Sequence, residues 1–176
     1  KIATIADLIS YRLRYDHLVN VVAETTIDSA YGGTFALKVY ATTVDPAEHV
    51  ALVKGDVSTG GPVLARVHAS NTLEDIFGAG GHRETLVHKA MDINGREGRG
   101  VIVLIRESKP NAISARLKRN EKDEQVGQQR LIEYGIGAQI LLDLGVRDML
   151  LLTSSQTVLP GSAGYGLQIV GRVPLE

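Results

Sequence analysis

Apolar and polar residues alternate with a period of two over residues 19–68. The alternating segments read VVAETTI, TFALKVYATT, HVALVKGD and PVLARVH, and clusters of turn-forming residues separate them at 31–33, 45–48 and 58–62. Successive side chains of a strand point to opposite faces of a sheet, so this period is typical of half-buried strands. The pattern predicts four short strands, mostly antiparallel neighbours.

The period becomes helical after Gly81. An apolar stripe predicts a helix up to Met91, and the run RGVIVLIRE then indicates a strand buried on both faces. Residues 111–129 are polar and weakly patterned. They lead into RLIEYGIGAQILLDLGV, which predicts a helix that ends at Gly145. DMLLLTSS indicates another buried strand, and YGLQIVGRVPL an edge strand closed by Pro174. We therefore expect a mixed α/β (α+β) domain, β-rich in its N-terminal half and with alternating helices and strands after it.

The first residues predict a separate helix. Thr4 and Asp7 have the spacing of a capping box in which Asp replaces the usual Glu, and an apolar stripe follows over residues 5–18. The chain begins at Lys1 rather than at Met, and its first turn is already patterned. We expect residues 1–22 to be a connector helix that follows another segment.

Composition places the chain among ordinary soluble globular proteins. Its 176 residues suffice for one compact domain, with 44% apolar and 22% charged residues. The net charge of −1 comes from 19 basic and 20 acidic residues spread along the chain, which gives no basic footprint for nucleic acid. No apolar run approaches the roughly 20 residues that cross a membrane. The absence of cysteine excludes disulfides and thiolate zinc sites. We expect a cytoplasmic protein with no nucleic-acid or membrane partner.

Two glycine-rich motifs could be mistaken for ligand loops. FGAGGHRE places Gly78, Gly80 and Gly81 before a helix, where free N–H groups can hold an anion. It lacks the lysine of a Walker loop and the dinucleotide fingerprint, so a surface turn is the favoured interpretation. In YGIGAQ, Gly135 and Gly137 lie inside an apolar stripe. Close packing of a helix explains them better than a nucleotide loop does.

The histidines give no metal site by their spacing. His82 and His88 are separated by six positions, which turns them about 120° apart on a helix, whereas a metal pair favours three or four. Glu84 and His88 share a helix face, and a surface ion pair is the favoured interpretation. HExxH, nucleophile-elbow and paired-carboxylate motifs are absent from the sequence. The residues alone therefore predict a fold without a catalytic site.

Several segments together resemble one enzyme family. HVALVKGDV, PVLARVH, EGRGVIVLIRE, YGIGAQILLDLGVRDMLLLT and GYGLQIVGRVPL have the order and spacing of GTP cyclohydrolase II. TIADLISYRLRYDHLV resembles the connector that follows the 3,4-dihydroxy-2-butanone 4-phosphate synthase domain of bifunctional riboflavin enzymes. The resemblance implies a GTP cyclohydrolase II-like domain over residues 23–176, a homodimer, and an N-terminal synthase domain in the same chain. Mg²⁺ is a possible cofactor of that synthase domain.

The resemblance also implies a metal site whose ligands this chain lacks. Enzymes of the family open the imidazole ring of GTP with a water activated by zinc, which three cysteines hold in HSEC and CDCG motifs. The HSEC segment corresponds to HASN here, with Ser70 at the glutamate and Asn71 at the cysteine. The CDCG motif falls within residues 81–85, which contain no cysteine. A tetrahedral thiolate site cannot form, so we expect neither zinc nor another cofactor in this domain.

Other chemical positions of the family differ as well. Its QEGR segment corresponds to residues 107–110, which read ESKP. Its catalytic Asp and Arg align with Arg130 and Ile132, and a phosphate-binding lysine aligns with Val158. We therefore expect no catalytic residue. The candidates for a vestigial substrate-binding site are Arg66, His68 and Thr153.

Three functions fit this pattern. The first is a catalytically degenerate GTP cyclohydrolase II-like domain, inactive itself, that scaffolds, dimerises or regulates an attached synthase. The full-length chain would then be a 3,4-dihydroxy-2-butanone 4-phosphate synthase, a lyase. The second is a divergent hydrolase that acts on GTP or a related nucleotide without thiolate zinc. The third is a sensor domain for a nucleotide or a flavin.

Overall fold

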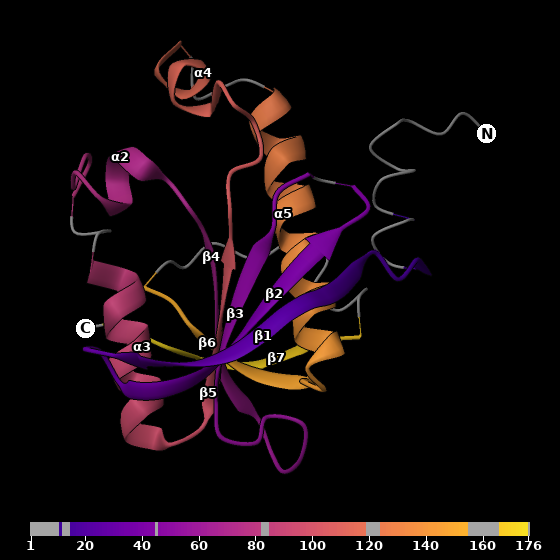
Figure 1. The fold of residues 1–176 in the computed structure, drawn as a ribbon, viewed down its shortest axis with the longest axis vertical. Coiled ribbons are helices and arrows are strands. Elements are labelled where there is room, and N and C mark those ends of the chain that lie inside the picture. Colours follow the sequence, from indigo (N-terminus) through magenta and orange to yellow (C-terminus); the bar gives the residue numbers. More distant parts are fainter. Residues whose placement is uncertain are drawn as a thin grey trace.

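A mixed seven-stranded sheet forms the centre of the molecule (Figure 1). The computed structural model describes residues 11, 15–44, 46–81, 85–118, 124–154 and 166–175. The strands are β1 (Val19–Ser29), β2 (Gly33–Thr42), β3 (His49–Lys54), β4 (Val63–Ala69), β5 (Gly100–Ile105), β6 (Asp148–Leu152) and β7 (Gln168–Val173). The helices are α2 (Thr72–Asp75), α3 (Leu86–Glu97), α4 (Ala112–Lys118) and α5 (Glu124–Asp143). The expected mixed α/β class is confirmed.

The sheet changes from antiparallel to parallel at its middle. Its strand order is β1-β2-β3-β5-β4-β6-β7. The first three strands and β5 pair antiparallel, whereas β4 pairs in parallel with β5 and with β6. The prediction of mostly antiparallel neighbours was therefore wrong for β4. The chain returns from β4 to β5 through α2 and α3, and such a helical crossover carries the next strand in the same direction.

The central strand β5 is buried on both faces, as its continuous apolar run predicts. Val101 and Val103 belong to the core under α5, and Ile102 points to the opposite core under α3. Figure 1 shows α3 and α5 on opposite sides of the sheet. Because side chains of a strand alternate, β5 serves both cores at once.

The two long helices end at left-handed glycines. Gly145 has φ 87° and follows α5, so the predicted stop is confirmed. Gly98 has φ 68° and caps α3, which therefore continues past Met91, where the predicted helix ended. Only glycine adopts this backbone conformation without a Cβ penalty. A Cβ at Gly137 would lie 2.7 Å from a methyl carbon of Val67, which confirms for Gly137 of YGIGAQ that a glycine permits close packing of α5.

The remaining segments complete the two ends of the sheet. β7 is an edge strand with alternating exposure, followed by Pro174, as predicted. The short helices α2 and α4 were not predicted, because neither is long enough to show a helical period. The predicted opening helix over 5–18 lies largely outside the described residues, and β1 begins at Val19. None of the helices that the structure describes is long and apolar enough to cross a membrane.

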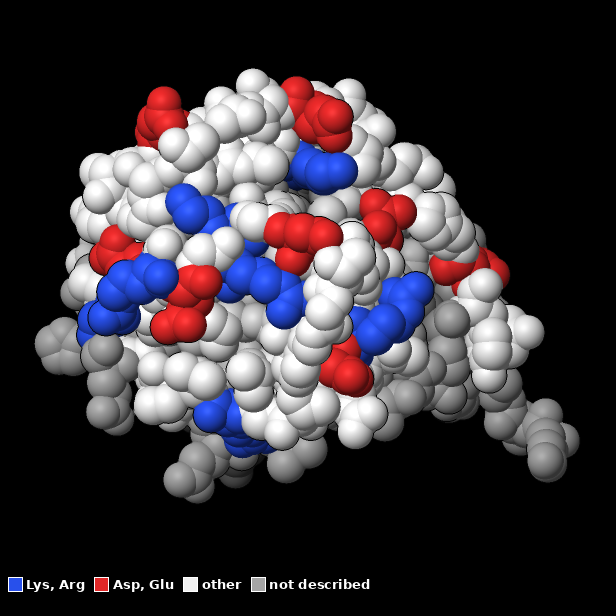
Figure 2. Space-filling model, turned by 90° about the horizontal axis from the view of Figure 1, so that it is seen from below, with Lys and Arg blue, Asp and Glu red and all other residues white. Residues whose placement is uncertain are grey.

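The surface at the lower end of the molecule in Figure 1 carries charged side chains of both signs. Figure 2 shows this face, with basic and acidic side chains interleaved on it. Alternating charges of this kind are typical of a solvated surface.

Candidate functional site

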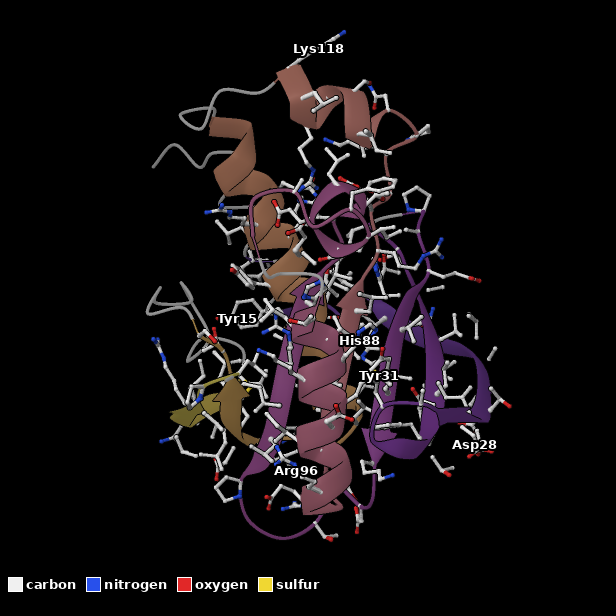
Figure 3. All side chains as sticks on the ribbon, turned by 90° about the vertical axis from the view of Figure 1, so that its left-hand side faces the viewer. Tyr15, Asp28, Tyr31, His88, Arg96 and Lys118 are labelled. Carbon is white, nitrogen blue, oxygen red and sulfur yellow. The ribbon has the colours of Figure 1, made fainter. Side chains whose placement is uncertain are left out.

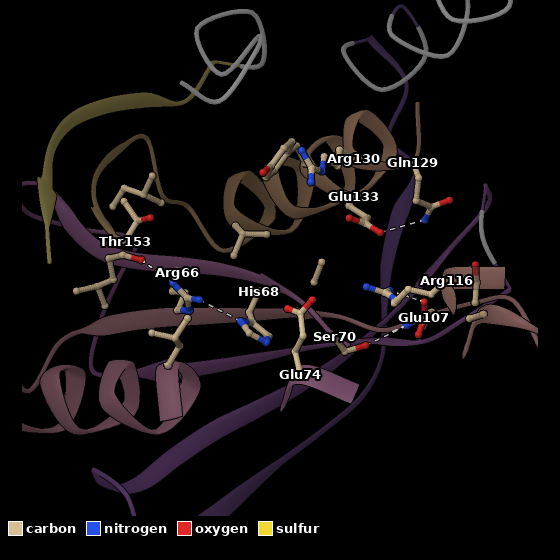
Figure 4. Close-up of a pocket in the computed structure, with 18 of the residues that line it drawn as sticks. Arg66, His68, Ser70, Glu74, Glu107, Arg116, Gln129, Arg130, Glu133 and Thr153 are labelled. Atoms are coloured by element: carbon tan, nitrogen blue, oxygen red, sulfur yellow. Dashed lines mark hydrogen bonds and ion pairs between the residues drawn. The ribbon is translucent and has the colours of Figure 1, made fainter. Parts of the chain in front are cut away.

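A cavity of about 640 Å³ opens at the carboxyl ends of the parallel strands β4 and β6. The last residues of these strands line its floor. The first turns of α5 line one wall, and the connection from β5 to α4 lines another (Figure 4). Ligands of open α/β sheets commonly bind outside the carboxyl ends of parallel strands. This cavity is therefore the candidate site.

The three residues singled out in the sequence meet in this cavity. Arg66, His68 and Thr153 all line it, from the ends of two neighbouring strands. Arg66 is 8% exposed and His68 is 2% exposed, and the Thr153 backbone N–H donates to Val173 O at 3.0 Å. All three residues thus lie at one cavity, and their role in binding a ligand stays a prediction.

Arg66 and His68 belong to a directed series of hydrogen bonds. Arg66 Nη1 donates to Leu152 O at 3.0 Å, and Arg66 Nη2 lies 3.1 Å from His68 Nδ1. A guanidinium only donates, so His68 Nδ1 must accept. His68 Nε2 lies 2.9 Å from Asp75 Oδ2. A carboxylate only accepts, so this ring nitrogen carries the proton. His68 is therefore the neutral Nε2–H tautomer, with both ring nitrogens in use.

The same carboxylate fixes the start of α2. The Asn71 backbone N–H donates to Asp75 Oδ2 at 2.7 Å. Asn71 is the N-cap of α2, and its side-chain oxygen accepts from the Leu73 N–H at 3.2 Å. We refer to the series Leu152 O, Arg66, His68, Asp75 and Asn71 N–H as the Arg66–Asp75 relay.

These residues do not fit the zinc that the family resemblance implies. The chain has no cysteine, and the part of it that the structure describes holds no group of three or more His, Asp or Glu able to bind a metal. Asn71, at the position of the first cysteine, uses its side-chain oxygen as a helix cap. Both nitrogens of His68 are hydrogen-bonded. His82 and Glu84 lie outside the described residues.

The two walls of the cavity each carry a further polar pair. Arg116 Nη2 donates to Glu107 Oε1 at 2.6 Å, and Gln129 Nε2 donates to Glu133 Oε1 at 3.1 Å (Figure 4). Burial raises the pKa of Glu133 above its ordinary value of 4.5, and the hydrogen bond from Gln129 and the charge of Arg116 offset part of this. The folded chain therefore holds a proton on Glu133 more firmly than the unfolded chain does.

Replacing Glu133 with glutamine is expected to raise the Tm at neutral pH by a few degrees. The folded pKa of Glu133 is raised, so its contribution to stability is complete below about pH 4.5 and is lost as pH rises through the folded value. Glutamine never ionises and does not lose that contribution. Thermal unfolding at pH 4 and pH 7 measures the effect, with Glu97→Gln on the exposed end of α3 as the control. A lower Tm for Glu133→Gln at pH 7 would contradict this account.

The other motif residues lie apart from the cavity. His88 is not among the residues that line it, and its ring stacks on Tyr31 with centroids 3.9 Å apart and planes 9° from parallel (Figure 3). The predicted ion pair with Glu84 falls outside the described residues. A Cβ at Gly80 or Gly81 would meet no atom within 4 Å in the described part of the chain, as in an open turn.

Sequence reasoning missed Asp75 and Glu133. An N-cap residue followed by acidic positions signals a helix start, so Asn71 with Glu74 and Asp75 could have indicated α2. Gln129 and Glu133 are four positions apart, a spacing at which helical side chains meet. The cavity that Gln129 and Glu133 line, and the contact of Asp75 with His68, follow only from the tertiary structure.

Comparisons with known proteins agree on one family. The family model described as GTP cyclohydrolase II matches residues 20–174. The chain is 40% identical to riboflavin biosynthesis protein RibBA of Bacillus cereus over 191 residues, and 41% identical to that of Chlorobium phaeovibrioides over 192 residues. Each match covers 100% of this chain, and 47% and 46% of the relative. The chain thus spans about half the length of the curated relatives it matches.

A solved structure has the same fold. The crystal structure of RibBX, a two-domain 3,4-dihydroxy-2-butanone 4-phosphate synthase from A. baumannii, superposes with a TM-score of 0.62 at 27% identity. The match covers 97% of this chain and 44% of that one. The likeness therefore concerns less than half of the larger protein.

Proposed function

Because the chain belongs to the GTP cyclohydrolase II family, we propose that it is a catalytically degenerate member that scaffolds, dimerises or regulates an attached 3,4-dihydroxy-2-butanone 4-phosphate synthase. The synthase would occupy the same polypeptide, and the whole would act in riboflavin biosynthesis. No zinc or other cofactor takes part in this domain's role under the proposal. Any Mg²⁺ would belong to the synthase.

The observation that carries the proposal is the structural use of positions that the resemblance assigns to chemistry. Ile132, aligned with the catalytic arginine, packs against the hydrophobic core. Asn71, aligned with a zinc-binding cysteine, caps α2. An isoleucine packed against the core has no group that can transfer a proton, and a side-chain oxygen used as a helix cap is not free for a substrate. The scaffold of the family remains, and the residues that perform its reaction have been replaced.

The attachment to a synthase is supported by the relatives. The curated relatives are named riboflavin biosynthesis protein RibBA, and the solved structure is described as a two-domain synthase. In each case this chain matches only about half of the other protein. A domain of this kind therefore occurs beside a further domain in other proteins.

The test compares the synthase polypeptide with and without the residues of this chain. We expect its removal to lower the Tm of the synthase and to change its oligomeric state or its rate, because a supporting domain acts through contacts with its neighbour. Calorimetry, light scattering and a synthase assay provide the three readouts. If all three stay unchanged, the proposal is wrong. Glu97→Gln, on the exposed end of α3 and outside the cavity, is the control that keeps the domain in place.

A second function, the sensor for a nucleotide or a flavin, is favoured by the cavity itself. Its volume of about 640 Å³ is within the usual range for small-molecule sites. Lys109 and Arg130 line it beside Glu74, Glu107 and Glu133, and the two cations could pair with an anionic ligand. In the same experiment, GTP or flavin mononucleotide would then change the synthase rate of the intact polypeptide. Arg66→Met would abolish that response. An unchanged rate with both ligands would refute the sensor function and leave scaffolding as the remaining proposal.

A further inference from the structure

We propose that the Arg66–Asp75 relay replaces a metal as the brace of this site, so that the fold of the cavity floor is independent of metal. The relay joins the end of β6, the end of β4 and the start of α2 through Leu152, His68 and Asp75. This inference does not depend on the proposed function, because no activity enters its tests.

The need for a brace follows from the size of α2. The helix has four residues, all of which the structure describes, and none of them is buried. Ile76 and Phe77, which follow it, are 70% and 73% exposed. Apolar burial therefore contributes little to holding this segment against the sheet. A helix this short is also unstable by itself, because its nucleation is unfavourable.

Asp75 supplies the contact that apolar burial does not. Its Oδ2 accepts from His68 at 2.9 Å and from the Asn71 N–H at 2.7 Å, so one oxygen ties α2 both to β4 and to its own N-terminus. The His68 side chain is 1% exposed and that of Asp75 is 21% exposed, so water can approach this bond only from the side of the carboxylate. A charged acceptor makes both hydrogen bonds stronger than neutral ones.

The relay also gives hydrogen-bond partners to both terminal nitrogens of the buried guanidinium on β4. Arg66 is 8% exposed, and its guanidinium is bonded to Leu152 O and to the neutral imidazole of His68. The Nε2–H of the imidazole in turn donates to the Asp75 carboxylate. A positive and a negative group thus stand at the two ends of one hydrogen-bonded series. Buried charges require such partners.

A metal would tie together the same stretch of chain. In the family that the sequence resembles, one zinc ligand lies at the position of Asn71 and the others lie beyond α2. Here the segment after β4 is instead closed by Asp75, and the residues do not fit zinc. In this chain, hydrogen bonds therefore hold the segment that the resemblance assigns to a metal.

The first test uses the unaltered chain and its response to metal. We expect the same Tm after exhaustive treatment with a chelator, and the same Tm after addition of zinc chloride. Elemental analysis of the protein purified without chelator should find zinc well below one atom per chain. A Tm that falls with the chelator, or stoichiometric zinc that raises it, would overturn the proposal.

The second test is a double-mutant cycle on the two ends of the imidazole bond. His68→Ala and Asp75→Ala are each expected to lower the Tm by roughly 5–10 °C. The first removes the acceptor of the buried Arg66 Nη2, and the second removes the acceptor of the buried His68 Nε2–H. The double variant should lower it no further than the larger single change. Asp56→Ala, a carboxylate outside the relay, is the control and should add to the effect of His68→Ala. Additive effects for the His68 and Asp75 pair would refute a shared brace.

A local readout keeps the test decisive if the alanine variants fold poorly. Asp75→Asn has nearly the same shape and removes only the charge. We expect amide exchange at Asn71 and Leu73 to quicken at least tenfold in this variant, whereas exchange within α5 stays unchanged. Asp75→Glu, which restores the carboxylate, should recover part of the protection. Uniform quickening across the chain, or none at Asn71, would count against the relay.

Discussion

Incubated with GTP and zinc, the chain is expected to release formate, a product of imidazole ring opening, no faster than buffer alone. Enzymes accelerate their reactions by about 10⁶-fold or more, so a family member with its cysteines should exceed this chain by at least that factor. The chain has no thiolate to hold zinc, His68 has both nitrogens engaged, and Ile132 packs against the core. None of these positions can activate a water molecule or accept its proton.

The measurement is formate production with time at several protein concentrations. A GTP cyclohydrolase II that retains its three cysteines is the positive control, assayed with and without chelator. Formate that rises in proportion to this chain, and that falls in the Arg66→Met variant, would establish the divergent hydrolase instead. The same result would refute the proposal of a catalytically degenerate domain. It would not affect the proposal of a metal-free brace, because that proposal is tested by the Tm and by amide exchange.

Replacing Gly95 with alanine is expected to destabilise the fold by about 2–3 kcal/mol, which lowers the Tm by roughly 5–10 °C. A Cβ at Gly95, on α3, would lie 2.5 Å from Gly32 Cα and 2.7 Å from Gly32 O. Gly32 cannot withdraw easily, because its N–H donates to Asp92 Oδ1 at 2.9 Å and its carbonyl accepts from Lys54 Nζ at 2.8 Å. The turn between β1 and β2 would have to leave the helix.

The matched control is Gly127→Ala on α5. A Cβ there would meet no atom within 4 Å in the described part of the chain, and alanine favours a helix over glycine by up to about 1 kcal/mol. We therefore expect Gly127→Ala to raise the Tm slightly, whereas Gly95→Ala lowers it. Chemical denaturation with both variants checks the difference. If both variants changed the free energy of unfolding equally, the turn between β1 and β2 would have moved away from α3 without a loss of stability.

The elements that the sequence predicted well are those with a long period or an uninterrupted apolar run. β5 was expected to be buried on both faces, and α5 was expected to end at Gly145, because burial on a face leaves a mark at every second or every third to fourth residue. α2 leaves no such mark, since it has four residues and no buried one. The parallel pairing of β4 also leaves none, because pairing partners far apart in sequence are chosen by topology.

For the candidate site, the sequence determined which chemistry is missing. The absence of cysteine is a fact of composition, and no folding could restore a thiolate. That Asn71 and Ile132 stand at chemical positions of the family is what the resemblance implies. The sequence also named Arg66 and His68 as candidates, and their spacing of two positions on one strand places both on one face.

Only the tertiary structure decided what occupies that place. Asp75 meets His68 because α2 is brought to the end of β4. Helix spacing alone brings Gln129 to Glu133, and this pair lines the cavity because α5 packs at the same end of the sheet. Hydrogen bonds require donors and acceptors within about 3 Å, and such distances between separate elements depend on packing. The sequence by itself determined the loss of a thiolate metal site, and the packing of helices on the sheet decided that a hydrogen-bonded relay stands there.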